Sequence, residues 1–250
     1  MNKKYSLLVT TAFLFLFQSC NYSNKNQTST EKEKNSVKEE NASEIVAPKP
    51  QTGKPINDFI PTGYKIFQEI KGDLNKDGVE DCVVIIKGTK KENVITDEYR
   101  GKLDRNRRGI IVLFKKNGNY IQKVKNYDCF SSENEDGGVY FAPELDVSIE
   151  KGKLYVHYGH GRYGYWTYTF RGKNNDFELI GYDSSENSGP IINSETSINF
   201  LTKTKVTKTN TNENAESGDE VFEEKKEKIK VDQLIRLSGI KDFDELETES

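Results

Sequence analysis

Short runs of β-branched and aromatic residues alternate with polar stretches rich in glycine, asparagine or aspartate along the chain after Pro61. The turn residues recur about every ten positions, a spacing typical of short strands joined by tight turns. This pattern predicts an all-β domain over residues 56–246, built as a compact antiparallel sheet or sandwich. The expected strands are Tyr64–Ile70, Cys82–Lys87, Gly109–Lys115, Tyr120–Lys125, Leu145–Ile149, Leu154–Tyr158, Trp166–Arg171 and Phe177–Tyr182. A more polar hairpin is expected from Ile198–Thr207 and Val221–Lys230, followed by a short strand or turn at Leu234–Leu237.

The chain before this domain lacks the alternation and divides into two segments. Two lysines precede the apolar run Leu7–Phe17, which is the order of a secretory signal peptide and predicts one over residues 1–19. A helix needs roughly twenty apolar residues to span a bilayer, so this run is too short for a permanent membrane span. Residues 20–55 contain few large apolar side chains and are expected to form a disordered tether.

The end of the signal segment, Phe17-Gln18-Ser19-Cys20, resembles the lipobox of bacterial lipoproteins. That motif usually has leucine three residues before the cysteine, whereas Leu16 lies one place earlier here. The resemblance implies cleavage before Cys20, attachment of lipids such as palmitate to Cys20, and anchoring to a membrane of the cell envelope. An ordinary signal peptidase site with an incidental cysteine is the alternative. The bias toward Asn, Lys and Ile, with no acidic cluster directly after Cys20, resembles lipoproteins of Bacteroidota in the outer membrane that face the periplasm.

An aspartate-rich loop separates the first two expected strands. Its sequence, Gly-Asp-Leu-Asn-Lys-Asp-Gly-Val-Glu-Asp over residues 72–81, has an oxygen-bearing side chain at alternate positions. Calcium prefers six to eight oxygen ligands. The expected ligands are the side chains of Asp73, Asn75, Asp77 and Asp81 and the backbone carbonyl of Val79. A structural Ca²⁺ ion would relieve the repulsion between the carboxylates; the alternative is a metal-free connection stabilised by Asx turns.

The pattern Asp-x-Asn-x-Asp-Gly-x-x-Asp between strands resembles the calcium loop of FG-GAP repeats, the β-propeller motifs related to the N-terminal domains of integrin α-chains. The resemblance covers about Tyr64–Ile86 and implies a propeller-blade-like hairpin unit. A closed propeller needs several blades, and this sequence has one such loop. More broadly, Tyr64 through this loop, Gly164–Phe170, Leu179–Tyr182 and Ile198–Leu201 resemble a family of uncharacterised bacterial lipoproteins, which implies no function.

Aromatic residues crowd one expected hairpin. Side chains with an apolar body and a polar tip suit either a half-buried sheet or a ligand-binding surface. The residues of this candidate ligand platform are Tyr155, His157, Tyr163, Tyr165 and Trp166. If several of these rings are exposed together, a glycan or protein partner in the envelope is expected to bind there.

Two further motifs do not define a catalytic site. The run Gly-His-Gly-Arg-Tyr-Gly over residues 159–164 matches the glycine spacing of a dinucleotide site, but a strand is expected where that site requires a helix. A glycine-rich hairpin turn is therefore predicted. His157 and His160 would lie on opposite faces of a regular strand, and further zinc ligands are not nearby.

Charge and cysteine content restrict the partners. The net charge of −3 gives no general attraction to nucleic acid, so we expect no nucleic-acid partner. The basic cluster of residues 100–108 is expected to be a solvated loop. An oxidising envelope permits Cys82 and Cys129 to form a disulfide; otherwise Cys82 is an apolar strand residue.

The sequence therefore favours a membrane-anchored envelope lipoprotein with a non-catalytic binding or interaction domain and a structural calcium loop. The alternative is an envelope hydrolase acting on a glycan or peptide, whose carboxylates converge only in the fold. Two carboxylates about 5–9.5 Å apart in a deep pocket would favour glycoside hydrolysis.

Overall fold

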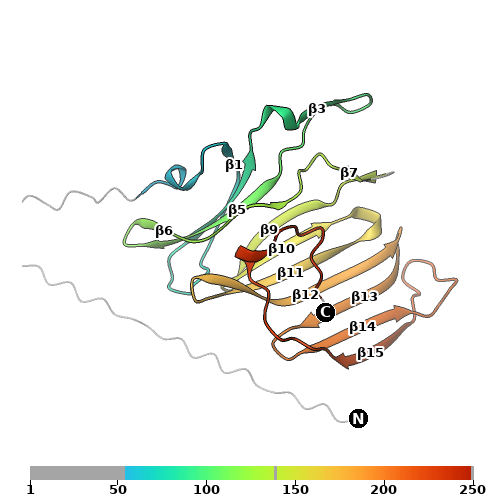
Figure 1. Cartoon of the computed structure of the whole chain (residues 1–250). Helices are drawn as coiled ribbons and strands as arrows, with labels where there is room; N and C mark the ends of the chain where they lie inside the picture. The colour runs from blue at the N-terminus through green and yellow to red at the C-terminus, as the bar shows by residue number, and fades with distance from the viewer. Residues whose placement is uncertain (1–53, 138–139, 249–250) are drawn as a thin grey trace, which may run out of the picture. The chain divides into compact units, whose positions relative to one another are not determined.

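The computed structural model describes residues 54–137 and 140–248. These residues form antiparallel β-sheets joined by turns and short 3-10 helices, which confirms the all-β prediction (Figure 1). The signal peptide, Cys20 and the expected tether up to residue 53 lie outside the described residues. Within the described part, no helix has the length and apolar character needed to cross a membrane.

The first sheet has four antiparallel strands in the order β1-β2-β5-β6, which is also their order along the chain. Their bounds are β1 Tyr64–Gly72, β2 Asp81–Gly88, β5 Arg108–Lys116 and β6 Asn119–Phe130. Every residue of β2 is buried, because side chains on both of its faces contact apolar neighbours. Strands β1 and β2 pair as an antiparallel hairpin at the edge of this sheet.

The second sheet has seven strands, and Figure 1 shows them following one another from yellow β9 to red β15. Every pair of neighbouring strands is antiparallel. Their bounds are β9 Glu144–Glu150, β10 Lys153–Gly159, β11 Gly164–Lys173, β12 Asp176–Ser188, β13 Ile191–Asn199, β14 Thr204–Asn210 and β15 Phe222–Lys228.

One strand prediction was wrong in this sheet. The expected strand Ile198–Thr207 is divided by a turn between β13 and β14. The Oδ1 atom of Asn199 accepts hydrogen bonds from the backbone N–H groups of Leu201 and Thr202, and Lys203 has a positive φ of 52°. A side chain that accepts hydrogen bonds from nearby backbone N–H groups favours a turn. The β-branched residues on either side favour strand, so the sequence pattern predicted one continuous strand.

The remaining elements are short. Two hairpins, β3 Val94–Asp97 with β4 Gly101–Asp104 and β7 Asp136–Gly137 with β8 Tyr140–Phe141, lie outside the two large sheets. The 3-10 helices are η1 Ile56–Phe59, η2 Lys91–Asn93, η3 Gly161–Tyr163 and η4 Leu237–Gly239.

One buried cluster, which we call the inter-sheet core, joins the two sheets. The four-stranded sheet contributes apolar side chains from β2, β5 and β6, and the seven-stranded sheet contributes them from β9 to β13. Its buried members include Val83, Ile85, Ile110, Val112, Val156, Tyr168, Phe170 and Phe177. The opposite face of the four-stranded sheet forms a smaller cluster, which Ile56 and Phe59 of η1 help to cover. The two sheets therefore share a core along one face of each.

The C-terminal segment, residues 229–248 after β15, covers one side of the inter-sheet core. Asn126 of β6 donates hydrogen bonds from Nδ2 to the carbonyls of Leu237 (2.9 Å) and Ile240 (2.7 Å). The backbone of Arg236 forms an isolated antiparallel β-bridge with Glu178 of β12. Phe243 is buried and donates its backbone N–H to the carbonyl of Cys129 at 3.0 Å. This segment thus binds both sheets, although the sequence predicted only a short strand or turn near its start.

Candidate functional site

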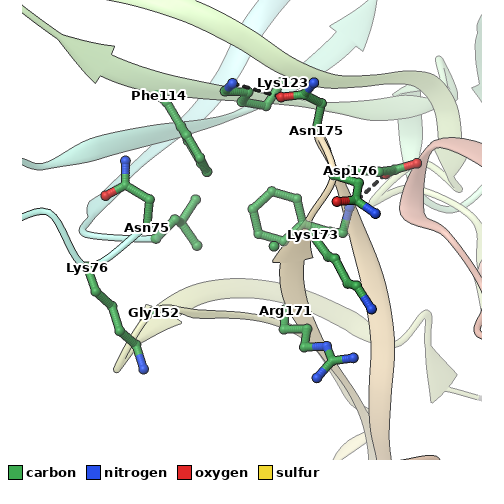
Figure 2. A pocket seen from close by; sticks show the side chains of 13 residues that line it. Asn75, Lys76, Phe114, Lys123, Gly152, Arg171, Lys173, Asn175 and Asp176 are labelled. Atoms are coloured by element: carbon green, nitrogen blue, oxygen red, sulfur yellow. Dashed lines mark hydrogen bonds between the residues drawn. The ribbon is translucent and has the colours of Figure 1, made fainter.

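The largest described cavity opens at one end of the inter-sheet core (Figure 2). Its volume is about 410 Å³, which lies within the roughly 300–1,000 Å³ of small-molecule sites. Three connections meet there: the aspartate-rich loop between β1 and β2, the turn between β9 and β10, and the turn between β11 and β12. The ends of β5 and β6 complete the wall. We call this cavity the basic pocket. Its lining includes Leu74, Asn75, Lys76, Phe114, Lys123, Arg171, Lys173, Asn174, Asn175, Asp176 and Phe177.

Apolar side chains form the floor of the basic pocket. Leu74 and Phe177 belong to the inter-sheet core, and the partly buried Phe114 packs against it. The rings of Phe114 and Phe177 meet edge to face, with centroids 6.3 Å apart. The floor is therefore a rigid extension of the core, because both rings are held by packing.

Four cationic side chains line the same cavity: Lys76, Lys123, Arg171 and Lys173. Arg171 and Lys173 share one acidic partner, because Glu178 Oε2 lies 3.1 Å from Arg171 Nη2 and 3.9 Å from Lys173 Nζ. Lys123 Nζ donates a hydrogen bond to the neutral amide oxygen of Asn175 at 2.9 Å.

Neither Lys76 nor Lys123 forms an ion pair with a carboxylate in the described part of the chain. The carboxylate that lines the pocket, Asp176, is held by hydrogen bonds within the protein. Its Oδ1 accepts the N–H of Phe177 at 2.7 Å, and its Oδ2 accepts the hydroxyl of Ser238 at 2.6 Å. The lining of the pocket consequently has an excess of positive charge, which attracts anions.

The turn between β11 and β12 places uncharged polar groups beside these cations. Asn174 and Asn175 have φ of 52° and 62°, the left-handed pair of a tight hairpin turn, for which asparagine is well suited. Asp176 then ties the turn to Ser238 in the C-terminal segment. Local sequence therefore determines the turn, and the tertiary contact sets its position.

The aspartate-rich loop forms the opposite wall. Asp73 Oδ1 accepts the N–H of Lys76 at 2.6 Å and Oδ2 accepts that of Gly78 at 2.9 Å, while Asn75 Oδ1 accepts the N–H of Asp77 at 2.9 Å. These contacts are Asx-type turns, which fold the loop on its own backbone. They present Asn75 and Lys76 at the edge of the basic pocket, where Figure 2 shows the Lys76 side chain running beside Gly152.

The loop gathers only part of the predicted calcium ligand set. Asp73, Asn75 and Asp77 lie on one turn, and Asn75 Nδ2 donates to Asp77 Oδ2 at 2.9 Å. Asp81 is fully buried, and its two oxygens accept the N–H groups of Leu74 (3.0 Å) and Lys115 (2.9 Å). Burial raises the pKa of Asp81, while these two hydrogen bonds oppose the shift. Among the described residues no group of three acidic, histidine or cysteine side chains is arranged to hold a metal, so calcium binding stays a prediction.

The candidate ligand platform is divided between two surfaces. Successive side chains of a strand point to opposite faces of a sheet. Tyr155, His157 and Tyr165 lie on the outer face of the seven-stranded sheet, where His157 Nδ1 is 2.8 Å from Thr167 Oγ1. Trp166 packs instead against the inter-sheet core and stacks on Tyr158 at 5.4 Å, while Tyr163 belongs to η3. The five residues therefore do not share one face of the sheet.

A shallow depression of about 210 Å³ on this outer face is the described cavity that brings Asp183 and Glu195 to one wall, next to Tyr165. Asp183 Oδ1 accepts the hydroxyl of Ser197 at 2.7 Å, and Glu195 lies 3.3 Å from Lys208 Nζ. Burial raises the pKa of the Tyr165 hydroxyl, with smaller contributions from the two carboxylates. This depression is therefore one described cavity whose wall contains two carboxylates, as the alternative hydrolase function requires.

The two cysteines downstream of Cys20 are free and buried. Cys82 belongs to the smaller cluster on one face of the four-stranded sheet, and Cys129 belongs to the inter-sheet core on the other. The sheet separates the two sulfur atoms, so the structure corresponds to the alternative in which Cys82 is an apolar strand residue. The expectation of a solvated basic loop was wrong for Arg108, which is buried and donates from Nε to the carbonyl of Ser131 at 2.8 Å.

Sequence reasoning missed the basic pocket, because its cations come from three separate connections or strands. Two signals were available: the Lys-Asn-Asn turn after Arg171 and the lysine inside the aspartate-rich loop. No protein-family model, curated protein or solved structure matches this chain. Any functional conclusion therefore rests on the geometry of its own residues.

Proposed function

We propose that this protein is a membrane-anchored envelope lipoprotein whose β-domain is a non-catalytic binding module for a small anionic ligand. One observation carries the proposal: the largest described cavity is lined by four cations, of which Lys76 and Lys123 have no carboxylate partner among the described residues. A cavity with a rigid apolar floor and a few converging polar groups is the usual form of a ligand site. Both oxygens of Asp176 already accept hydrogen bonds from Phe177 and Ser238, so this carboxylate is poorly placed to act as a general base. The pocket is therefore better suited to binding than to catalysis.

Replacing Lys76 or Lys123 with glutamine is expected to weaken anion binding roughly twofold to fivefold in each case, because each solvent-accessible ammonium contributes up to about 1 kcal/mol. The measurement is calorimetric titration of the full chain in detergent with glucuronate, citrate and inorganic phosphate at low salt. Raising the ionic strength should weaken binding further, since exposed charges are screened. Lys226→Gln is the matched control, because Lys226 is exposed on β15, outside the pocket. Absence of binding by all three probes, or equal losses in the control, would contradict the proposal.

The membrane anchor rests on the signal segment and on Cys20, which lies outside the described residues. The chain without substitutions is expected to stay in the membrane fraction after a salt wash. The reason is that two or more acyl chains on Cys20 would anchor it stably. Cys20→Ala should lose this retention, whereas Ser23→Ala should keep it. Labelling with radioactive palmitate supplies an independent readout. Retention of Cys20→Ala after the salt wash would show that the lipid is not the anchor.

We also propose that the aspartate-rich loop binds Ca²⁺ as a structural ion. The gathering of Asp73, Asn75 and Asp77 on one turn supports this proposal. With a dissociation constant of about 10⁻⁴ M and roughly 1 mM free calcium, the ion would stabilise the domain by about 1.4 kcal/mol. The melting temperature should then rise by a few degrees between EGTA and millimolar Ca²⁺, and Asp77→Ala should abolish the rise. Equal melting temperatures of the unmutated chain in both buffers would leave the metal-free Asx loop as the correct description.

A hydrolase is the second candidate, for which Asp183 and Glu195 supply a carboxylate pair in the shallow outer depression in place of the deep pocket expected for glycoside hydrolysis. Side chains diagonally opposed on neighbouring strands lie about 7–8 Å apart, within the range for inverting glycosidases. Release of new reducing ends from an envelope glycan, abolished by Asp183→Asn, would establish this function in place of pure binding.

A further inference from the structure

We infer that the ligand of the basic pocket is an acidic saccharide: a sugar ring that carries a carboxylate or a phosphate. This inference rests on the proposed function, because it names the class of anion that the pocket takes. Three features of the pocket bear on the choice: its size, its uncharged polar groups and the state of its aromatic floor.

The size of the cavity disfavours a bare inorganic anion. A water molecule takes up about 30 Å³ of liquid, so a phosphate ion would leave most of the 410 Å³ filled with solvent. It would also leave the carboxamides that line the cavity without a ligand partner. A ligand that combines an anionic group with several hydroxyls uses both kinds of lining.

The uncharged groups match hydroxyl chemistry. A carboxamide offers both a donor and an acceptor, and the pocket includes Asn75, Asn174 and Asn175. Sugar hydroxyls are likewise both donors and acceptors. Asn75 and Asn175 already make hydrogen bonds to Asp77 and Lys123, so the Asn174 carboxamide is the amide with most capacity for a hydroxyl. Arg171 adds a planar guanidinium beside Lys173. Its Nε and Nη2 contact Glu178, which leaves Nη1 to donate to a carboxylate or phosphate oxygen of the ligand.

The aromatic floor disfavours a nucleotide. A base binds by stacking on an exposed ring face. Phe177 is only 1% exposed, and the Lys123 ammonium lies 5.4 Å from the centroid of the Phe114 ring. Figure 2 shows Lys123 and Asn175 joined at the edge of the pocket on the side of Phe114. The floor thus has no open aromatic face for a base, and the partly buried Phe114 is the aromatic side chain left to contact the C–H groups of a sugar ring.

Asn174 allows the saccharide to be separated from the anion. Its φ of 52° suits glycine, so Asn174→Gly removes the carboxamide while keeping the turn. Asn117 has nearly the same φ, 51°, in the turn between β5 and β6, and it does not line the pocket. Asn117→Gly is therefore the matched control for the backbone change.

The experiment is calorimetric titration of the full chain in detergent with five probes. They are a glucuronate-terminated disaccharide, the same disaccharide with its carboxylate reduced to an alcohol, glucose 6-phosphate, adenosine monophosphate and inorganic phosphate. We expect the acidic disaccharide or the sugar phosphate to bind at least tenfold more tightly than the neutral disaccharide, the nucleotide and inorganic phosphate. Asn174→Gly should weaken the best saccharide about fivefold and leave inorganic phosphate unchanged, while Asn117→Gly changes neither.

The outcomes distinguish failure of the saccharide inference from failure of the proposed anion-binding function. A preference for glucuronate over glucose 6-phosphate, or the reverse, supports the inference and identifies the anionic group. Inorganic phosphate or the nucleotide binding as tightly as the acidic saccharides, with losses in Lys76→Gln and Lys123→Gln, would overturn the saccharide while retaining an anion site. Binding of the neutral disaccharide alone, or of none of the probes, would overturn both the inference and the proposed anion-binding function.

Discussion

Replacing Phe243 with alanine is expected to lower the free energy of unfolding by about 3–5 kcal/mol. Phe243 is 1% exposed, and its ring lies 4.9 Å from that of Phe130 and 5.1 Å from that of Tyr168. Alanine would leave a cavity between the two sheets, because neighbours held by both sheets can relax only in part. It would also loosen the C-terminal segment that covers the core. Denaturant unfolding of the variant, followed by tryptophan fluorescence, measures the change.

Phe141→Ala is the matched control for this substitution. Phe141 is 87% exposed, so its removal should change the stability by no more than about 0.5 kcal/mol. Similar losses in the two variants, or a loss below about 1 kcal/mol for Phe243→Ala, would show that the C-terminal segment does not close the core.

The second large effect is expected at Gly164, the last glycine of the Gly-His-Gly-Arg-Tyr-Gly run. Its φ of 108° and ψ of −149° lie in a region that essentially only glycine occupies, at a cost of about 1–3 kcal/mol for other residues. A Cβ atom would also overlap the carbonyl oxygen of Ser185 on the neighbouring strand β12. Gly164→Ala should therefore destabilise the domain by about 3 kcal/mol or more, as measured by thermal and denaturant unfolding.

Gly161 in the same run supplies the comparison. Its φ is 50°, but a Cβ atom there would meet no atom within 4 Å. Gly161→Ala should cost about 1 kcal/mol, the usual penalty for a left-handed residue. Equal effects of the two substitutions would indicate that the contact with Ser185 does not contribute. The glycine spacing that matches a dinucleotide motif thus has a structural cause, since a strand follows it as the sequence predicted.

The sequence by itself determined the fold class and most of the hairpins. The period-two pattern and the glycine and asparagine turns are local signals, because side chains and φ angles at a turn depend on a few neighbouring residues. This explains why the strands corresponding to β2, β5, β9 and β10 were predicted to within one residue of their observed bounds, whereas β6 and β12 extend beyond the expected Tyr120–Lys125 and Phe177–Tyr182. The signal segment and the aspartate-rich loop were likewise recognisable from residues that are adjacent in the chain.

Only the tertiary structure decided which residues share a surface. The cations of the basic pocket come from three separate places in the sequence, Lys76, Lys123 and the pair Arg171 and Lys173, and they meet because two sheets pack at one core. The faces of Tyr165 and Trp166 could not be assigned from composition, since a shift of one residue in register exchanges inward and outward side chains. The burial of Arg108 and the closure by Phe243 depend in the same way on partners from distant strands. Local patterns specify strands and turns, whereas a binding site depends on long-range packing that no local pattern encodes.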